Sequence, residues 1–88
     1  MERISGPYKG YFIAAYSVEA GNQFVGYAKV CAEEPESVWN VNVVEKLTSA
    51  RAYSELEAVT AAEQKARRVI ADMAAGWDSS TSPGALEN

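Results

Sequence analysis

Apolar and polar residues alternate through the first half of the chain, and this pattern predicts β-strands. Residues 8–19 and 24–32 are rich in aromatic and β-branched side chains, which are typical of strands. Between them lies the sequence Ala-Gly-Asn-Gln at residues 20–23, and glycine and asparagine tolerate the positive φ angles that hairpin turns require. We therefore predict that these two strands form an antiparallel hairpin.

A third strand is predicted over residues 38–47, where the alternation is regular. Two asparagines, Asn40 and Asn42, alternate there with apolar residues. The apolar positions are Trp39, Val41 and Val43. Because successive side chains of a strand point to opposite faces, the apolar set is predicted to face the core and the asparagines the solvent. Residues 48–53 show no regular pattern and are interpreted as a connection.

A single helix is predicted from Glu55 to about residue 75. The sequence Ser-Glu-Leu-Glu at residues 54–57 is a capping box, alanine dominates the segment that follows, and Gly76 is placed to end it. The apolar stripe of the helix consists of Val59, Ala62, Ala66, Val69, Ile70 and Met73. The small alanines allow the helix to approach a sheet closely, and Trp77, near the centre of the stripe, is predicted to dock on the sheet edge.

The order of these elements predicts an α+β fold. We expect a three-stranded antiparallel sheet in β-β-β-α order, with one long C-terminal helix packed on one face. Residues 8–77 are predicted to form this single domain. Residues 1–7 contain a Gly-Pro pair and are interpreted as a flexible leader, whereas residues 78–88 have the Ser, Thr, Pro and Gly content of a disordered tail.

The predicted helix covers only one face of the sheet, so part of the aromatic content is left for the other face. The first two predicted strands contain more aromatic rings than one helix covers, and neighbouring residues of a strand point in opposite directions. A contiguous aromatic patch on an uncovered face is typical of an interaction surface. The candidate residues for this surface are Tyr8, Tyr11, Tyr16 and Tyr27.

Composition narrows the possible chemistry. The chain has no histidine, which removes the commonest acid–base catalyst near neutral pH and every His-containing metal site. Its one cysteine, Cys31, is interpreted as a small buried hydrophobe. We therefore expect no enzymatic activity, no catalytic residue, no cofactor and no metal. With one cysteine, no signal peptide and no apolar run of about 18 residues, the chain is expected in the cytoplasm and not in a membrane.

The charge balance is negative, with 12 acidic and 8 basic side chains giving a net charge of −4. Three of the acids, Glu33, Glu34 and Glu36, surround Pro35. A calcium-binding loop places its oxygen ligands at a fixed spacing around a glycine, and that spacing is missing here. The segment is therefore interpreted as a solvated acidic loop.

A basic group on the predicted helix supports an alternative function, nucleic-acid binding. Double-stranded RNA-binding domains also carry a basic patch on a helix that follows a three-stranded sheet. Here Glu63 and Asp72 interrupt the patch, and the negative net charge opposes phosphate binding. The helical candidates are Lys65, Arg67 and Arg68. The alternative requires them to converge in space with Lys9 and Lys29.

Three segments of the chain resemble a group of small bacterial proteins of unknown role. The segments are Tyr-Lys-Gly-Tyr-Phe-Ile at residues 8–13, Tyr-Ser-Glu-Leu-Glu-Ala at residues 53–58, and Ala-Arg-Arg-Val-Ile-Ala-Asp at residues 66–72. Here an alanine separates the isoleucine from the aspartate, whereas the two are adjacent in the group. The resemblance implies a hairpin-rich sheet followed by one alanine-rich helix and a bacterial source, and it brings no catalytic or binding residue with it.

These observations lead to one expected function and one alternative. We expect a small non-enzymatic protein that acts through protein–protein contacts on the uncovered sheet face, with an unknown protein or a second copy of itself as partner. The alternative is a nucleic-acid-binding module built like a double-stranded RNA-binding domain.

Overall fold

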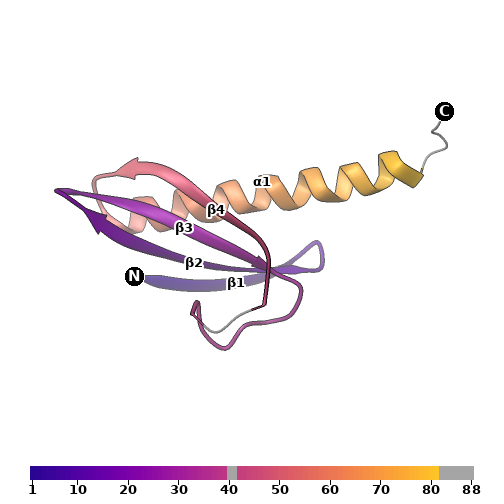
Figure 1. Ribbon diagram of the computed structural model, residues 1–88, viewed down its shortest axis with the longest axis horizontal. Coiled ribbons are helices and arrows are strands. Elements are labelled where there is room, and N and C mark those ends of the chain that lie inside the picture. Colours follow the sequence, from indigo (N-terminus) through magenta and orange to yellow (C-terminus); the bar gives the residue numbers. More distant parts are fainter. Residues whose placement is uncertain (40–41, 82–88) are drawn as a thin grey trace.

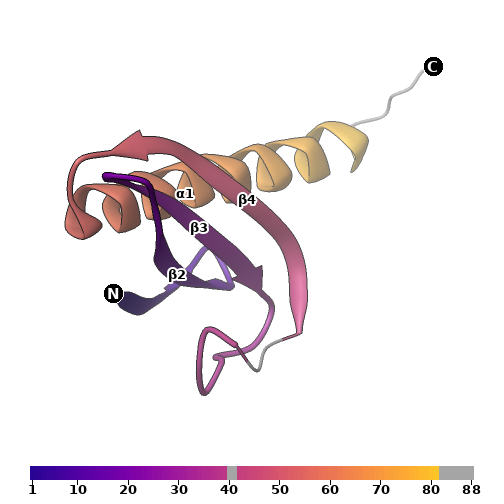
Figure 2. The ribbon, with the colours of Figure 1, turned by 60° about the vertical axis from the view of Figure 1, so that its left-hand side comes forward.

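The computed structural model describes residues 1–39 and 42–81, and the side chains up to residue 74. Its elements follow the order β1 (Glu2–Tyr8), β2 (Tyr11–Ala20), β3 (Gln23–Cys31), β4 (Val43–Ala52) and α1 (Glu55–Thr81). The strands form one antiparallel sheet in the order β1-β2-β3-β4, and α1 crosses one face of it (Figures 1 and 2). The predicted α+β class, antiparallel sheet and C-terminal helix are confirmed, but the sheet has four strands rather than three.

The additional strand, β1, lies where a flexible leader was predicted. It pairs with β2 from Glu2 opposite Tyr16 to Tyr8 opposite Tyr11. The predicted strand over residues 8–19 is therefore interrupted by a two-residue turn, in which Lys9 has a φ of 51° and Gly10 a φ of 87°. Positive φ at both central positions is the type I′ geometry that joins antiparallel strands. The usual signal is Asn-Gly, so a lysine in the first position hides the turn.

The positive φ of Lys9 leads us to expect a more stable protein when a residue that favours this conformation replaces the lysine. Lysine tolerates a left-handed conformation less well than asparagine, so Lys9→Asn is expected to raise the free energy of unfolding by roughly 0.5 kcal/mol, measured by urea denaturation. The control Lys9→Ala removes the same side chain, whose Nζ lies 5.8 Å from the centre of the Tyr8 ring, without relieving the backbone. A gain with alanine, or none with asparagine, would argue against strain at this turn.

The hairpin between β2 and β3 is confirmed. Ala20 pairs with Gln23, and Gly21 in the turn between them has a φ of 70°. The next predicted strand, over residues 38–47, is wrong in its bounds, because β4 runs from Val43 to Ala52 and includes most of the predicted connection. β4 is an edge strand whose small and polar side chains, such as Thr48, give little alternation to detect.

The predicted inward face of the third strand is also wrong. Trp39 is 63% exposed and Val43 is 40% exposed, whereas Val38 is fully buried in the loop that joins β3 to β4. Asn42 is exposed, as predicted, and Asn40 and Val41 lie outside the described residues. The alternating pattern therefore belongs to a loop that turns one valine inward and one tryptophan outward, and only its end belongs to a strand.

The main core lies between the sheet and α1. Its fully buried members from the sheet are Ile13, Ala15, Ala28 and Val30, and those from the helix are Val59, Ala62, Ala66 and Ile70. Most of the predicted apolar stripe is therefore confirmed. The two layers approach each other closely at Gly26 of β3, where an added Cβ would lie 2.0 Å from the Ala58 carbonyl oxygen.

The helix begins at the predicted capping box. The Glu57 backbone N–H donates to Ser54 Oγ at 3.1 Å, and the Ser54 hydroxyl donates to Glu57 Oε1 at 3.3 Å. The helix runs to Thr81 and so includes residues 78–81 of the predicted tail, and the predicted stop at Gly76 is wrong. Figure 1 shows the C-terminal part of α1 extending beyond the sheet. The predicted docking of the Trp77 side chain and the rest of the predicted tail lie outside the described residues.

β1 is held to the helix by a buried carboxylate. Arg3 Nη1 lies 2.7 Å from Glu63 Oε1, and the Ser5 hydroxyl donates to Glu63 Oε2. Burial raises the pKa of Glu63, but the hydrogen bonds from Ser5 and Arg3 and the charges of Arg3 and Arg67 outweigh it, so the pKa lies below its ordinary value. The carboxylate is therefore a stabilising group in its ionised form.

This shift predicts how stability depends on pH. A lowered folded-state pKa contributes stability above the unfolded value of about 4.3, and that contribution is lost as the pH falls through the folded pKa. Glu63→Gln is therefore expected to lower the free energy of unfolding at pH 7 by about 1–2 kcal/mol. The difference from the parent should shrink below about pH 4 in denaturation series. The exposed Glu45→Gln serves as the control, and a difference independent of pH would contradict the assignment.

Candidate functional site on the helix-free face

The four candidate tyrosines do not form one patch. Tyr8 and Tyr11 pack against the core between the sheet and α1. Tyr16 and Tyr27 are opposite each other on β2 and β3 and lie on the face that carries no helix. Tyr16 is five positions after Tyr11, and an odd step along a strand reverses the face. The structure therefore keeps two of the four candidates together on the uncovered face.

A third aromatic residue joins Tyr16 and Tyr27 on the helix-free face. The two tyrosine rings stack with centroids 5.3 Å apart and an interplanar angle of 17°, and the Trp39 ring lies 4.7 Å from that of Tyr16. Trp39 Nε1 donates to the Glu2 carboxylate at 3.0 Å. We call Tyr16, Tyr27 and Trp39 the aromatic cluster. Sequence reasoning missed Trp39 because its alternating neighbours placed it in the core.

A buried lysine holds the cluster and the loop in place. Lys29 is only 9% exposed, and its Nζ donates to the Val38 carbonyl at 2.7 Å. The same ammonium lies 5.5 Å from the centre of the Tyr16 ring and 5.3 Å from that of Trp39. Both distances are within the range of a cation–π interaction. Lys29 therefore fastens the loop from β3 to β4 over the sheet and orients the outer ring, Trp39.

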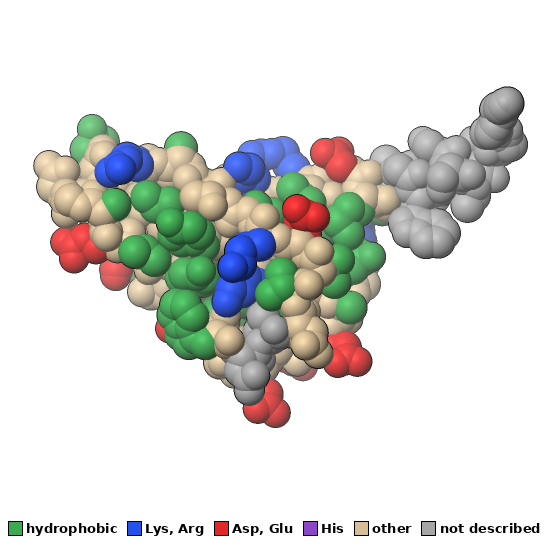
Figure 3. All heavy atoms as spheres, viewed as in Figure 1, with side chains coloured by type: hydrophobic (Ala, Val, Ile, Leu, Met, Phe, Trp, Pro, Cys, Tyr) green, Lys and Arg blue, Asp and Glu red, His purple; other side chains and the backbone are tan. Residues whose placement is uncertain are grey.

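The aromatic cluster continues into an apolar band. Val18 and Val25 are cross-strand partners two residues beyond the tyrosine pair, and Val18 is 44% exposed. Cross-strand partners share a face, so both valines lie on the helix-free side. We define the helix-free band as Val18, Val25 and the aromatic cluster. Figure 3 shows hydrophobic side chains gathered along the sheet from the end where β2 turns into β3 toward the loop, with basic side chains beside them.

Two titratable groups of this face, the Tyr16 hydroxyl and the Cys31 thiol, have pKa values above their ordinary values. Burial, followed by the neighbouring Tyr27, raises the pKa of Tyr16. Burial raises the pKa of the Cys31 thiol and outweighs the opposing charge of Lys29. Cys31 is 1% exposed, so its interpretation as a small buried hydrophobe agrees with the structure. Neither group has the lowered pKa that an activated nucleophile requires.

The candidate basic residues are divided between the two sides of the sheet. Lys65 Nζ donates to the Thr48 carbonyl at 2.6 Å, and the Arg67 guanidinium lies 5.2 Å from the centre of the Tyr8 ring, which Lys9 also approaches. Arg68 is exposed on α1. Lys29 lies on the opposite face of the sheet from the helix and is buried. The convergence of five cations that nucleic-acid binding was predicted to require is therefore absent from the described residues.

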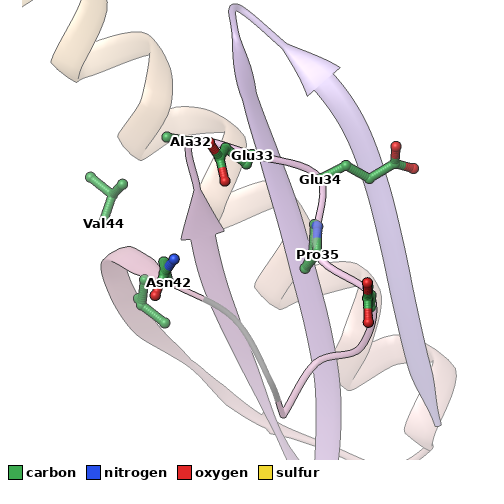
Figure 4. A pocket seen from close by; sticks show the side chains of 8 residues that line it. Ala32, Glu33, Glu34, Pro35, Asn42 and Val44 are labelled. Carbon is green, nitrogen blue, oxygen red and sulfur yellow. The ribbon is translucent and has the colours of Figure 1, made fainter.

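A hollow of about 530 Å³ lies where the loop meets the start of β4. Its lining is Ala32, Glu33, Glu34, Pro35, Glu36, Asn42, Val43 and Val44. Figure 4 shows the Glu34 carboxylate pointing away from Asn42 and Pro35, so the acidic side chains do not converge. Among the described side chains, which end at residue 74, no group of three or more His, Cys, Asp or Glu residues is arranged to hold a metal ion.

Fold and site together define a four-stranded antiparallel sheet with a helix on one face and an exposed aromatic band on the other. Comparisons with models of protein families, with curated proteins and with solved structures find no match to this chain. The resemblance to small bacterial proteins is thus supported only as far as a sheet followed by a C-terminal helix. In the part of the chain that the structure describes, no helix has the length and apolar content needed to cross a membrane.

Proposed function

We propose that this protein is a non-catalytic binding domain that acts through protein contacts on its helix-free face. The observation that carries the proposal is the exposure of the helix-free band. Trp39 is 63% exposed and Val18 is 44% exposed, although both belong to a continuous apolar surface. Water-exposed aromatic patches of this kind are typical of interaction sites, where tyrosine and tryptophan are enriched among the few residues that contribute most to binding.

The rigidity of the band supports the same proposal. Trp39 is fixed by Tyr16, by Lys29 and by its hydrogen bond to Glu2, so its ring is already ordered before any partner arrives. A pre-ordered aromatic side chain loses little conformational entropy on binding, which favours affinity. An aromatic ring held this firmly and still exposed is better suited to recognition than to fold stability alone.

Photo-crosslinking tests the proposal directly. A benzoylphenylalanine placed at Val18, on the band, is expected to form adducts with protein in extracts of the producing cells. The same group at Arg68, exposed on α1, is the control and should form few adducts. Adducts from Val18 should disappear when Tyr27→Ala is added. Equal labelling from both positions, or adducts with nucleic acid alone, would overturn the proposal.

A further inference from the structure

We infer that the partner of the helix-free face is a second copy of this chain, related to the first by a two-fold axis parallel to the strands. This inference rests on the proposed function, because it names the occupant of the same face. Its basis is the charge of the two outer strands on this face, which is negative at Glu2 of β1 and positive at Lys46 and Arg51 of β4. When the same faces of two copies pack together, these opposite charges lie across from each other.

The strand registers arrange the helix-free side chains in rows. Cross-strand partners share a face, so one row runs from Glu2 on β1 through Tyr16 and Tyr27 to Thr48 on β4. The rings are at the centre of this row, and the carboxylate is at its β1 end.

The two neighbouring rows end in bases on β4. Lys46 is opposite Lys29 on one side of Thr48, and Arg51 is opposite Val25 on the other side. Both bases are exposed, and Arg51 donates to the Ala20 carbonyl at 3.2 Å, which keeps its guanidinium at that end of the face. The helix-free face therefore carries one carboxylate on β1, that of Glu2, an apolar middle and two bases on β4.

Among the described side chains, no carboxylate forms an ion pair with Lys46. Lys46 lies directly across from another lysine, Lys29, and like charges in cross-strand positions are unfavourable. Among the described residues, the ion pairs involve the Met1 amine, Arg3, Glu55 and Glu63, and neither Lys29 nor Lys46 takes part in one. The β4 side of the face therefore lacks the carboxylate that would neutralise it.

A two-fold axis between β2 and β3 supplies that carboxylate. Rotation about an axis along the strands places β1 of one copy over β4 of the other, so Glu2 faces Thr48 of the second copy, between its Lys46 and Arg51. The same operation places Tyr16 over Tyr27 of the second copy, with the Trp39 ring that covers Tyr16 between them. Because Trp39 and its loop lie on this face, the two sheets stay farther apart than the roughly 10 Å of directly packed sheets, and the long side chains of Lys46 and Arg51 bridge the gap to Glu2. Each charge contact then occurs twice, as isologous symmetry requires.

A charge swap across the proposed interface tests this arrangement. Sedimentation equilibrium at low salt is expected to show a dimer with a dissociation constant in the micromolar range, about what a small face supports. Glu2→Lys and Lys46→Glu should each weaken it at least about tenfold, because each creates like-charge contacts. The double variant Glu2→Lys/Lys46→Glu should bind more tightly than either single variant, because it restores the charge contacts, although the hydrogen bond from Trp39 to Glu2 stays lost. Asp72→Lys and Arg68→Glu make the same charge changes on exposed positions of α1 and should leave the dimer unchanged.

Circular dichroism melts of each variant separate loss of association from loss of folding. A chain that sediments as a monomer at all concentrations would overturn the dimer. So would a dimer that the single swaps weaken but the double swap does not partly restore, or one that none of them affects. If the chain is monomeric but Val18 still crosslinks to other proteins, the inference fails and the proposed function stands. If Val18 yields no protein adduct, the proposed function fails as well.

Discussion

Gly26→Ala is expected to lower the free energy of unfolding by more than about 3 kcal/mol, which is a large part of the total for a domain of this size. An ideal Cβ at this position would lie 2.0 Å from the Ala58 carbonyl oxygen, 2.7 Å from the Ala58 carbonyl carbon and 2.8 Å from Ser49 Oγ. Two of these atoms belong to the backbone of α1, so relief requires the whole helix to move away from β3. We expect a chain that is largely unfolded or has a greatly reduced Tm.

The matched control for this substitution is Gly10→Ala. Gly10 has a φ of 87°, and nothing lies within 4 Å of its added Cβ, so alanine there costs only backbone strain, about 1–2 kcal/mol. Urea denaturation followed by circular dichroism gives both values. A Gly26→Ala chain as stable as the Gly10→Ala chain would show that the helix does not approach the sheet as closely as described.

Lys29→Met is expected to have the second largest effect, because it releases the loop that carries Trp39. The substitution removes the hydrogen bond to the Val38 carbonyl and both cation–π contacts, while methionine retains most of the volume. A buried carbonyl left without a partner costs about 1–3 kcal/mol, and relief of the buried charge offsets part of that. We expect a net loss of about 2 kcal/mol and a shift of the Trp39 emission to longer wavelength, measured with Trp77→Phe in both chains.

Lys46→Met provides the control for the lysine prediction. Lys46 is the cross-strand neighbour of Lys29 but is exposed, so its removal should change the free energy of unfolding by less than about 0.5 kcal/mol. Dilute protein keeps association from contributing to the comparison. If the two substitutions have equal effects, or if the Trp39 emission does not change in Lys29→Met, Lys29 does not hold the loop.

The sequence predicted correctly those elements that are specified by residues close to them in the chain. The capping box at Ser54 and the alanine-rich apolar stripe identified the start and the buried face of α1, and the glycine at position 21 identified the hairpin between β2 and β3. Each of these signals lies within a few residues of the structure that it specifies. The end of the helix was placed wrongly because one glycine, Gly76, costs only about 1 kcal/mol in a helix interior.

The remaining errors arise where long-range contacts override local pattern. β1 is short and polar, and it is ordered by Arg3 and Ser5 reaching Glu63 some sixty residues away. The loop from β3 to β4 has the alternating sequence of a strand. Instead, the hydrogen bond from Lys29 to the Val38 carbonyl holds this segment as a loop against the helix-free face of the sheet. Neither partner can be identified from sequence spacing.

The type of candidate site, an aromatic surface, was predicted from the sequence, but only some of its residues were. An aromatic surface on the uncovered face was expected, and Tyr16 and Tyr27 lie there. Tyr8 was assigned with them because the turn at Lys9 was not recognised, so that two strands were treated as one. Tyr11 lies an odd number of positions from Tyr16, so strand alternation alone separates it from the other two. Trp39 belongs to the site because the loop from β3 to β4 folds over the sheet, and the path of a loop cannot be predicted from sequence periodicity.

Proton NMR of the folded protein tests the central claim, that the loop holds Trp39 against the sheet as an exposed aromatic surface. With the Tyr16 and Trp39 rings 4.7 Å apart, nuclear Overhauser effects are expected between their ring protons, and between the Tyr16 and Tyr27 rings. The Trp39 indole ring should also remain accessible to a soluble paramagnetic agent, because that residue is 63% exposed. Absence of the Trp39–Tyr16 contacts, or a Trp39 ring protected from the agent by the core of the same molecule, would contradict the account.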